Sequence, residues 1–147
     1  MLAAHMYNGN WYMLAGAGAF STGVTVSSGL TYNGMPGHLV TITSAGEYNF
    51  LIARNFTYGY IGASDSQVEG TFRWMTGPEN GTVVSPTFWN IGEPNNSGLI
   101  EDCVEVVNGK WNDNQCSLVR NWIIEFECRP SALTNVSCPS KIMIRKT

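Results

Sequence analysis

The chain has 147 residues, which is the length of one domain and enough to bury a hydrophobic core. Charged residues make up only 13%, about half of the usual share, and the formal net charge is −3. The basic residues are dispersed instead of forming a stripe, which argues against binding to nucleic acid or to an anionic membrane surface. No apolar run reaches the roughly 20 residues of a membrane span, so we expect no membrane insertion.

The first third of the chain predicts a strand, a weak helix and a second strand. Residues 1–6 are too short for a signal peptide, so we expect a trimmed start or an artificial leader there, with His5 outside the fold. Aromatic and small residues over 8–19 predict an opening strand and turn. A helix over 21–32 is weakened by its glycines, and HLVTITS at 38–44 predicts a short buried strand.

The middle of the chain begins with a helix start signal. Ser44 and Glu47 have the capping-box spacing, which predicts a helix that continues to Ala53. Strands are predicted over 58–65 and 71–75. The Pro, Gly and Asn residues that follow predict a long loop.

The last third predicts a hairpin and a closing strand. Residues 101–107 alternate like a strand, Asn108-Gly109 is a strong hairpin turn, and the return strand follows it directly. Residues 121–128 alternate again as the closing strand. The fold class is therefore predicted to be α+β, with helices early and a loop-rich antiparallel sheet late.

Four cysteines lie in the last third: Cys103, Cys116, Cys128 and Cys138. They form no CxxC motif and have no histidine nearby, so two disulfides in an oxidising, secreted or extracellular setting are favoured over zinc. Three pairings are formally open. A Cys103–Cys116 bond would close a short loop across the hairpin, worth about 3 kcal/mol in the chain-entropy model. This favours that pairing and leaves Cys128 with Cys138.

The acidic residues concentrate in two neighbouring segments, where their repulsion requires a counter-charge. The members are Asp65, Glu69, Glu93, Glu101, Asp102, Glu105 and Asp113. Calcium is a hard cation that takes about six to eight oxygen ligands from carboxylates, amide carbonyls and water. The loop at 92–103 and the WND motif at 111–113 together supply such a set, namely Glu93, Asn95, Glu101, Asn112 and Asp113.

Pro94 separates two of these candidate ligands. An X–Pro bond adopts the cis form cheaply and could then aim both neighbouring side chains at one point, so we predict a cis Glu93–Pro94 peptide. A carboxylate accepts a hydrogen bond from a hydroxyl, whereas a carboxamide donates one while its oxygen faces the metal. Two adjacent sugar hydroxyls could thus bind metal, carboxylate and amide together. The same segments are also ordinary turn compositions, so on their own they leave a plain loop open.

Taken together, the motifs resemble the C-type lectin-like domain. GHLVTITS, IGASD with VEGTFRWMTG, FWNIGEPNN, EDCV, WND and EFEC occur in the order and spacing of that family, from about Tyr7 to Arg129. The combination is far more specific than any single motif. The resemblance implies the C-type lectin fold, with two helices, antiparallel sheets and a long calcium-binding loop region. The domain would cover 7–130, followed by a C-terminal extension over 131–147.

The resemblance also implies two calcium sites. The principal site would use Glu93, Asn95, Glu101, Asn112 and Asp113, with sugar hydroxyls completing the coordination. The EPN order implies mannose, fucose, glucose or N-acetylglucosamine rather than galactose. The auxiliary site would use Asp65, Glu69, Glu101 and Asp102, with Asn96 where some relatives have an aspartate, and the lost charge should weaken calcium binding there.

The cysteines depart from the family pattern. The family usually has a cysteine in the first helix, about where Tyr32 lies, paired with the closing one, which here is matched by Cys128. Cys138 is then the expected substitute partner. The first helix therefore lacks the disulfide that holds it in the family, and it is expected to depend on packing through Phe20 and Tyr32.

No catalytic set can be assembled from the remaining residues, and we expect no enzyme. His38 is expected to have a structural role at the junction of helix and strand. Among the tryptophans, Trp111 is expected to support the site loop, and the others to pack in the core. Glu93 and Glu101 resemble a glycosidase pair in composition, but a carboxylate that binds a metal is neither a good proton donor nor a free nucleophile.

The sequence thus favours a calcium-dependent, carbohydrate-binding module that holds one terminal sugar of a glycan, with a dissociation constant on the order of millimolar. Several copies, as in a homo-oligomer, would then be needed for useful avidity. The alternative is a protein-interaction or ice-binding domain of the same fold, in which calcium only shapes the loops.

Overall fold

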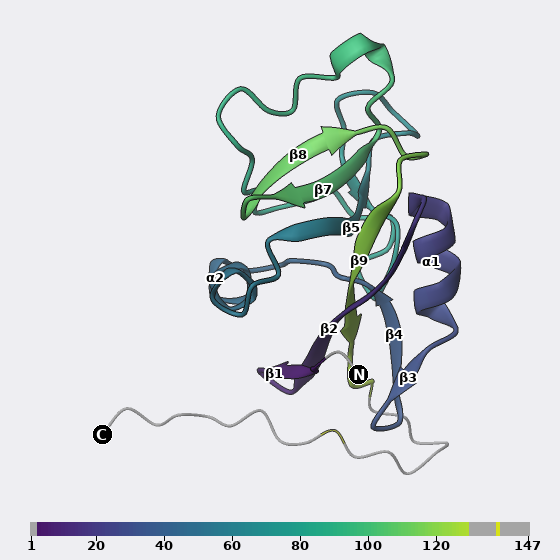
Figure 1. Cartoon of the computed structure of the whole chain (residues 1–147), viewed down its shortest axis with the longest axis vertical. Helices are drawn as coiled ribbons and strands as arrows, with labels where there is room; N and C mark the ends of the chain where they lie inside the picture. Colours follow the sequence, from purple (N-terminus) through teal and green to yellow (C-terminus); the bar gives the residue numbers. More distant parts are fainter. Residues whose placement is uncertain (1–2, 130–137, 139–147) are drawn as a thin grey trace.

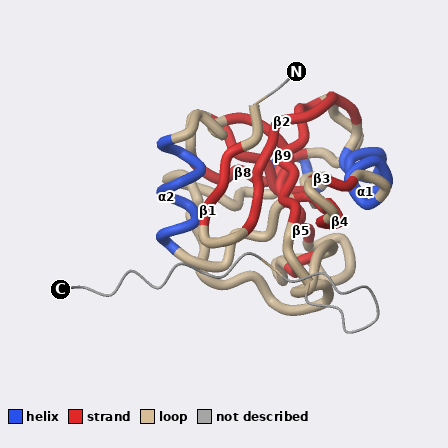
Figure 2. Tube along the Cα trace, turned by 90° about the horizontal axis from the view of Figure 1, so that it is seen from below, coloured by secondary structure: helices blue, strands red, loops and turns tan. Residues whose placement is uncertain are grey.

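The computed structural model describes residues 3–129 and Cys138, which form nine strands, two α-helices and one 3-10 turn. The strands are β1 His5–Tyr7, β2 Asn10–Gly18, β3 Thr31–Tyr32, β4 Met35–Leu39, β5 Tyr58–Ser64, β6 Arg73–Trp74, β7 Cys103–Val107, β8 Lys110–Asn114 and β9 Arg120–Phe126. The helices are α1 Phe20–Ser28 and α2 Ala45–Ala53, and the 3-10 turn η1 spans Ser97–Leu99. The two helices flank the strands on opposite sides (Figure 2). The predicted α+β class is confirmed.

The closing strand β9 is the centre of the sheet, whose order is β1-β2-β9-β5-β7-β8 (Figure 1). β9 pairs antiparallel with β2, from Trp11 opposite Phe126 to Gly18 opposite Arg120. It also pairs antiparallel with β4 and meets β5 in parallel at Trp122. Because β2 comes early in the chain and β9 comes late, the beginning and the end of the described fold lie side by side.

α1 is held by packing, without a disulfide. Gly23 lies so close to Trp122 that a Cβ atom at this position would be 2.5 Å from the indole ring. Phe20 packs edge-on against Tyr60, with ring centroids 5.7 Å apart. Tyr32 contacts the aromatic rings of the sheet next to the helix. Both aromatic residues expected to support this region therefore pack as predicted.

α2 begins where the capping box predicts. The Ser44 hydroxyl accepts a hydrogen bond from the Glu47 amide at 3.1 Å, which satisfies one of the free N–H groups of the first turn. The helix ends at Ala53, as predicted. Glu47 itself is only 5% exposed, so its carboxylate is turned towards the interior.

The hairpin of β7 and β8 has the predicted turn. Asn108 and Gly109 take φ values of 48° and 78°, the left-handed conformation that an Asn-Gly turn supplies. A disulfide between Cys103 and Cys116 ties β7 to the segment after β8. A second disulfide joins Cys128 to Cys138. Both favoured pairings are confirmed.

The hydrophobic core is built around aromatic side chains. Trp74 and Trp111 are 1% and 0% exposed, and their rings meet edge to face with centroids 6.2 Å apart. Trp122 is buried in a second cluster against α1, and Trp89 packs edge-on against Trp111. The prediction that these tryptophans pack in the core is confirmed.

Two predicted strands are displaced or shortened. β4 spans Met35–Leu39 instead of 38–44. Val40 still bonds through its backbone to β9 and β5, but from Thr41 on backbone amides bond to side chains instead. Thr41, for example, donates its amide hydrogen to the Glu125 carboxylate at 3.2 Å. β6 is only the two residues Arg73–Trp74.

The expectation that His5 lies outside the fold is wrong. His5 begins β1 opposite Tyr12, and its ring packs edge-on against Phe56 with centroids 5.8 Å apart. Of the predicted C-terminal extension, only Cys138 lies within the described residues. In this described part of the chain, no helix is both long and apolar enough to cross a membrane.

Candidate functional site

The loop between Asn90 and β7 is anchored on β8 by one buried carboxylate. Asp113, 1% exposed, accepts the backbone amide of Asn95 on one oxygen at 3.0 Å and that of Asn96 on the other at 2.7 Å. The predicted cis peptide bond between Glu93 and Pro94 is present. The strand with the WND motif and the EPN turn are therefore in direct contact. Asn95 and Asp113, which make this contact, are 18 residues apart in the chain.

The other predicted ligands of the principal site are linked within this loop. The Asn95 carboxamide donates to Glu93 at 3.0 Å, and its oxygen accepts from the Ser97 amide at 2.9 Å. The same Ser97 amide donates to Glu101 at 2.8 Å. The second oxygen of Glu93, Oε2, is buried and has no hydrogen-bond partner. Four of the five predicted residues thus form one linked group.

The fifth predicted residue, Asn112, lies beside Asp113 on β8 but bonds in another direction. Its side-chain nitrogen donates to Glu105 at 3.2 Å. Since the nitrogen and the oxygen stand on opposite sides of a carboxamide, this bond turns the Asn112 oxygen away from Glu105. The bond therefore sets the orientation of the oxygen that a metal would use.

Glu105 was counted among the clustered acids but was given no role by the sequence. It is 2% exposed on β7, directly opposite Asn112 in the hairpin register. Besides Asn112 it accepts hydrogen bonds from Asn114 at 2.6 Å and from Arg120 at 2.5 Å. A buried acid in the middle of an alternating strand, facing an asparagine across the turn, is the signal that could have identified it as a support for the ligand strand.

The predicted auxiliary residues form a second group next to the first. Ligand oxygens of Asp65, Glu69 and Asp102 lie within 4.8 Å of one another. One oxygen of Asp65 accepts the Gly70 amide at 2.9 Å, while the other, Oδ1, is buried without a partner.

Asn96 connects the two groups. Its side-chain nitrogen donates to Glu69 at 2.7 Å, and its side-chain oxygen accepts the Glu101 amide at 3.1 Å. Asn96, predicted for the auxiliary site, thus has both ends of its carboxamide engaged, one by each group.

The electrostatics of these two groups are unbalanced. Among the described residues, no Lys, Arg or His nitrogen lies within 4.0 Å of their carboxylates, and the one Arg–Glu pair belongs to Glu105. Desolvation, with the neighbouring Asp113, raises the pKa of Glu93. Desolvation, with Asp102 and Asp113, also raises the pKa of Asp65. Hard oxygen donors, two of them buried and unpartnered, suit a divalent cation such as calcium.

Trp111 supports this loop from below, as predicted. Its amide donates to the Phe88 carbonyl at 2.9 Å, and its carbonyl accepts the Asn90 amide at 2.9 Å. The fully buried indole ring packs edge-on against both Phe88 and Trp89. The segment that leads into the EPN turn is thereby fixed to the strand that carries Asn112 and Asp113.

Residues 32–126, which include both acidic groups, match the family model of the Lectin C-type domain. The chain belongs to the C-type lectin family. It is 45% identical over 91 residues to C-type lectin domain family 4 member M of Pan troglodytes, covering 58% of this chain and 19% of that protein. It is 43% identical over 100 residues to the CD209 antigen of Nomascus concolor, covering 64% and 22%. The chain therefore spans about a fifth of the length of these curated relatives.

Solved structures of C-type lectins share the fold. The carbohydrate-recognition domain of cow CD23, crystallised in the presence of a GlcNAc2Man3 oligosaccharide, matches with a TM-score of 0.71 and 30% identity, covering 87% of this chain and 95% of that one. The trimeric Kupffer cell C-type lectin receptor Clec4f matches with a TM-score of 0.68 and 27% identity, covering 87% and 85%. The predicted C-type lectin fold is confirmed.

Family membership also supports a general function. C-type lectin domains are carbohydrate-binding and non-enzymatic, in line with the prediction that this chain is not an enzyme. Domains of this family generally bind Ca²⁺, and the acidic groups described above supply residues that could hold it.

Proposed function

We propose that this domain binds the terminal sugar of a glycan through a calcium ion held by Glu93, Asn95, Glu101, Asn112 and Asp113. The observation that carries the proposal is the linked group around Asp113, in which the EPN turn is bonded to β8 while Glu93 Oε2 is buried without a partner. Calcium would supply the positive charge that these carboxylates lack and would accept oxygen atoms of the sugar.

The residues themselves would orient the sugar. Glu93 and Glu101 accept hydrogen bonds from hydroxyl groups, and Asn95 and Asn112 donate them. A pair of adjacent hydroxyls with the matching geometry then meets an acceptor and a donor at once. The order Glu93 before Asn95 supports mannose, fucose, glucose or N-acetylglucosamine as ligands, in keeping with the mannose-containing oligosaccharide named with the cow CD23 domain.

A glycan array with and without chelator tests this proposal. We expect binding to mannose-type glycans in saturating calcium and loss of that binding when calcium is removed. Absence of binding to any glycan in saturating calcium would reject the proposal and favour a protein-interaction or ice-binding domain in which calcium only shapes the loops. Glycan binding that survives the chelator would reject the role of the metal.

The sugar preference has a separate test. The double variant Glu93→Gln with Asn95→Asp reverses the order of acceptor and donor in the turn and should move the preference towards galactose. The measurement is competition by free mannose and free galactose for the same immobilised glycan. Unaltered mannose selectivity would contradict the ordering argument while leaving calcium-dependent binding intact.

The second acidic group supports a further calcium ion, held by Asp65, Glu69, Glu101 and Asp102 next to Asn96. Because Asn96 is neutral, we expect this ion to bind more weakly than it would with an aspartate there. An anomalous-scattering experiment on crystals grown in calcium would detect both ions. Two disulfides support a secreted or cell-surface location for the domain, and the trimeric Clec4f neighbour supports avidity through a homo-oligomer.

A further inference from the structure

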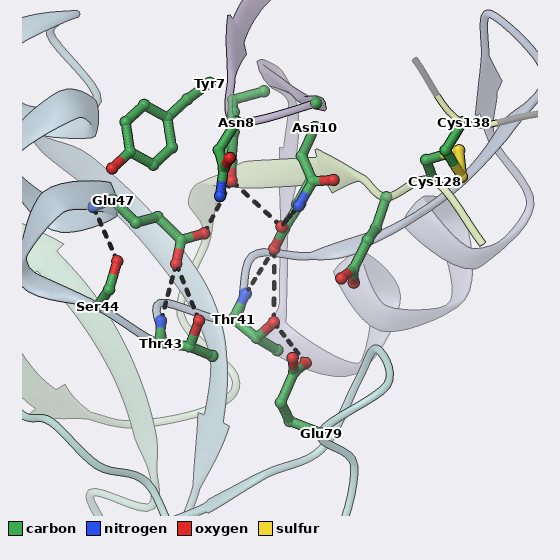
Figure 3. Close-up of a pocket in the computed structure, with 14 residues that line it drawn as sticks. Tyr7, Asn8, Asn10, Thr41, Thr43, Ser44, Glu47, Glu79, Cys128 and Cys138 are labelled. Carbon is green, nitrogen blue, oxygen red and sulfur yellow. Dashed lines mark hydrogen bonds between the residues drawn. A yellow bond between two sulfur atoms is a disulfide. The ribbon is translucent and has the colours of Figure 1, made fainter. Parts of the chain in front are cut away.

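A polar cavity of about 470 Å³ lies where β1, β2 and β9 meet the start of α2 (Figure 3). Four carboxylates line it, here called the cavity acids: Glu47, Glu79, Glu125 and Glu127. None of them belongs to the proposed sugar site. Within the described residues, the only Lys, Arg or His side chain within 4.0 Å of a cavity acid is His38.

Most oxygens of the cavity acids have hydrogen-bond donors. Thr41 Oγ1 donates to Glu79 at 2.8 Å, and the amide of Thr43 donates to Glu47 at 2.8 Å (Figure 3). Glu125 accepts from Asn10 at 2.8 Å and from the Thr41 amide at 3.2 Å. These donors are neutral, so the cavity keeps an excess of carboxylates. Desolvation, reinforced by the neighbouring carboxylates, raises the pKa of Glu125 to about 8.

His38 is held in one orientation at the edge of this group. Its side chain is 5% exposed, and Nδ1 lies 2.7 Å from the carbonyl oxygen of Leu39. A carbonyl only accepts, so Nδ1 carries a hydrogen and donates it. Gly77 packs against the ring so closely that a Cβ there would be 2.7 Å from Cε1. In the neutral imidazole, Nε2 therefore presents a lone pair.

That lone pair faces two carboxylates. His38 Nε2 lies 3.4 Å from Glu127 Oε2 and 3.9 Å from Glu125 Oε2, and ligand atoms of all three residues lie within 4.8 Å of one another. Nε2 and Glu127 Oε2 are both buried without a hydrogen-bond partner. Three atoms that bear lone pairs repel one another unless a cation, either a proton or a metal ion, stands between them. Ligands of a tetrahedral zinc ion lie about 3.3 Å apart, so the distance from His38 to Glu127 already fits and Glu125 would have to move closer by a small side-chain rotation.

We propose that His38, Glu125 and Glu127 bind a divalent transition-metal ion of the zinc type. An imidazole ligand favours zinc over calcium, which prefers oxygen donors alone. The outer contacts are in place, because Leu39 orients the imidazole ring, and Asn10 and Thr41 orient the Glu125 carboxylate. The cavity supplies room for a water molecule as the fourth ligand. The site is independent of the proposed sugar site.

The test is zinc binding to the whole chain after chelation and dialysis, at neutral pH and in saturating calcium so that the hard-oxygen groups are filled. Calorimetry and elemental analysis should find one zinc ion per chain, and cobalt in its place should give the intense visible absorption of a four-coordinate ion. His38→Gln and Glu127→Gln should each weaken zinc binding by more than the roughly 10–100-fold that follows loss of an outer-shell partner.

Two matched variants complete the test. Glu79→Gln changes a cavity acid that is not a proposed ligand, and His5→Gln removes the other histidine, so both should keep zinc binding. Glu127→Gln, at a partly exposed position, should fold even if His38→Gln does not, and circular dichroism checks each variant. Failure to bind zinc, or binding that persists in Glu127→Gln, would overturn the proposal. NMR showing a doubly protonated His38 ring that added zinc leaves unchanged would instead establish an ion pair with Glu127.

Discussion

The domain has two groups of acidic side chains at different ends, and they are satisfied in different ways. The loop acids are the carboxylates of the two proposed calcium sites, near η1 at the top of Figure 1, and the cavity acids lie near β1. Three of the four cavity acids, Glu47, Glu79 and Glu125, accept hydrogen bonds from Tyr, Thr and Asn side chains and from backbone amides. Among the loop acids, Glu93 and Asp65 each keep one buried oxygen without any donor.

The difference teaches that the donors around an acidic group say more about its purpose than its composition does. Hydrogen bonds from inside the protein hold a carboxylate in one orientation, as they do for Asp113 and Glu125, while each oxygen keeps a lone pair that a cation can use. An acid with a buried oxygen that accepts no hydrogen bond lacks a partner that a bound cation would supply. The same criterion, applied to the cavity, singles out Glu127 and His38 from neighbours that are otherwise well bonded.

The largest effect should come from a loop acid compared with a cavity acid. We expect Glu101→Gln to lower calcium affinity by about 100-fold, because a charged ligand is lost, and to abolish sugar binding at millimolar calcium. Glu79→Gln, the matched change among the cavity acids, should leave both unaltered. Calorimetry with calcium and retention on immobilised mannose measure the two effects. Sugar binding retained by Glu101→Gln would remove the proposed functional difference between the two groups.

The second largest effect should come from Glu105, which holds the Asn112 side chain next to the loop acids. Glu105→Leu removes the acceptor that orients Asn112, and we expect calcium affinity to fall roughly 10–100-fold, as for other outer-shell partners. Arg120→Met acts on the other oxygen of the same carboxylate, which does not bond to Asn112. It should cost about 2 kcal/mol of unfolding free energy while keeping calcium affinity within a factor of two or so. Equal calcium affinity in Glu105→Leu and the parent would show that Asn112 is oriented by other means.

The pH dependence of stability should separate the two groups. Desolvation raises the pKa of Glu47 above its ordinary value of 4.5. Above that value the unfolded chain has lost a proton that the folded protein keeps, so stability falls as pH rises towards the folded pKa. In chelator, urea unfolding from pH 5 to pH 8 should show this fall, and Glu47→Gln should reduce it. An unchanged slope in Glu47→Gln would contradict the assignment.

In the presence of calcium, the contribution of the loop acids to the unfolding free energy should rise with pH instead of falling. Protons compete with calcium for the carboxylates, so the stabilisation gained from calcium should grow as pH rises and vanish towards pH 4 or so. The same urea series in saturating calcium measures it. Calcium affinity that is equal at pH 7 and pH 4.5 would contradict this prediction.

The smallest effect should come from the helix cap that carries Glu47 into the cavity. Ser44→Ala removes the hydroxyl that accepts the Glu47 amide and should cost about 1 kcal/mol in unfolding free energy. Calcium affinity should stay the same, because α2 does not contact the loop acids. Ser44→Asp, which can still cap the helix, is the control and should remain near the parent. Chemical denaturation measures all three proteins.

The sequence predicted elements best where the signal is local. The capping box at Ser44, the Asn108-Gly109 turn and the cis Glu93–Pro94 bond each depend on neighbouring residues, and each is found in the structure. The end of β4 was misplaced because Thr41 bonds to Glu125, which is distant in the chain. Composition could not show that partner.

The sequence named candidate residues that the structure brings close together, although it did not show all of their contacts. The family motifs named Asn112, but its bond to Glu105 arises from strand register and could be seen only in three dimensions. The cavity acids were overlooked because β2, β9 and α2 bring them together from distant parts of the chain. The available signal was the spacing of Ile123 and Glu125 on one face of β9, which Glu127 continues just after the strand ends, since Ile123 is fully buried.

The pairing of β2 with β9 has one more consequence. Trp11 lies opposite Phe126, so the early strand β2 and the closing strand β9 meet at the end of the domain remote from η1 (Figure 1). A linker joined to this end of either strand would leave the domain on the side opposite the loop that carries Glu93. Several copies joined through such linkers would all present their Glu93 loops outward and could bind several glycans of one surface at the same time.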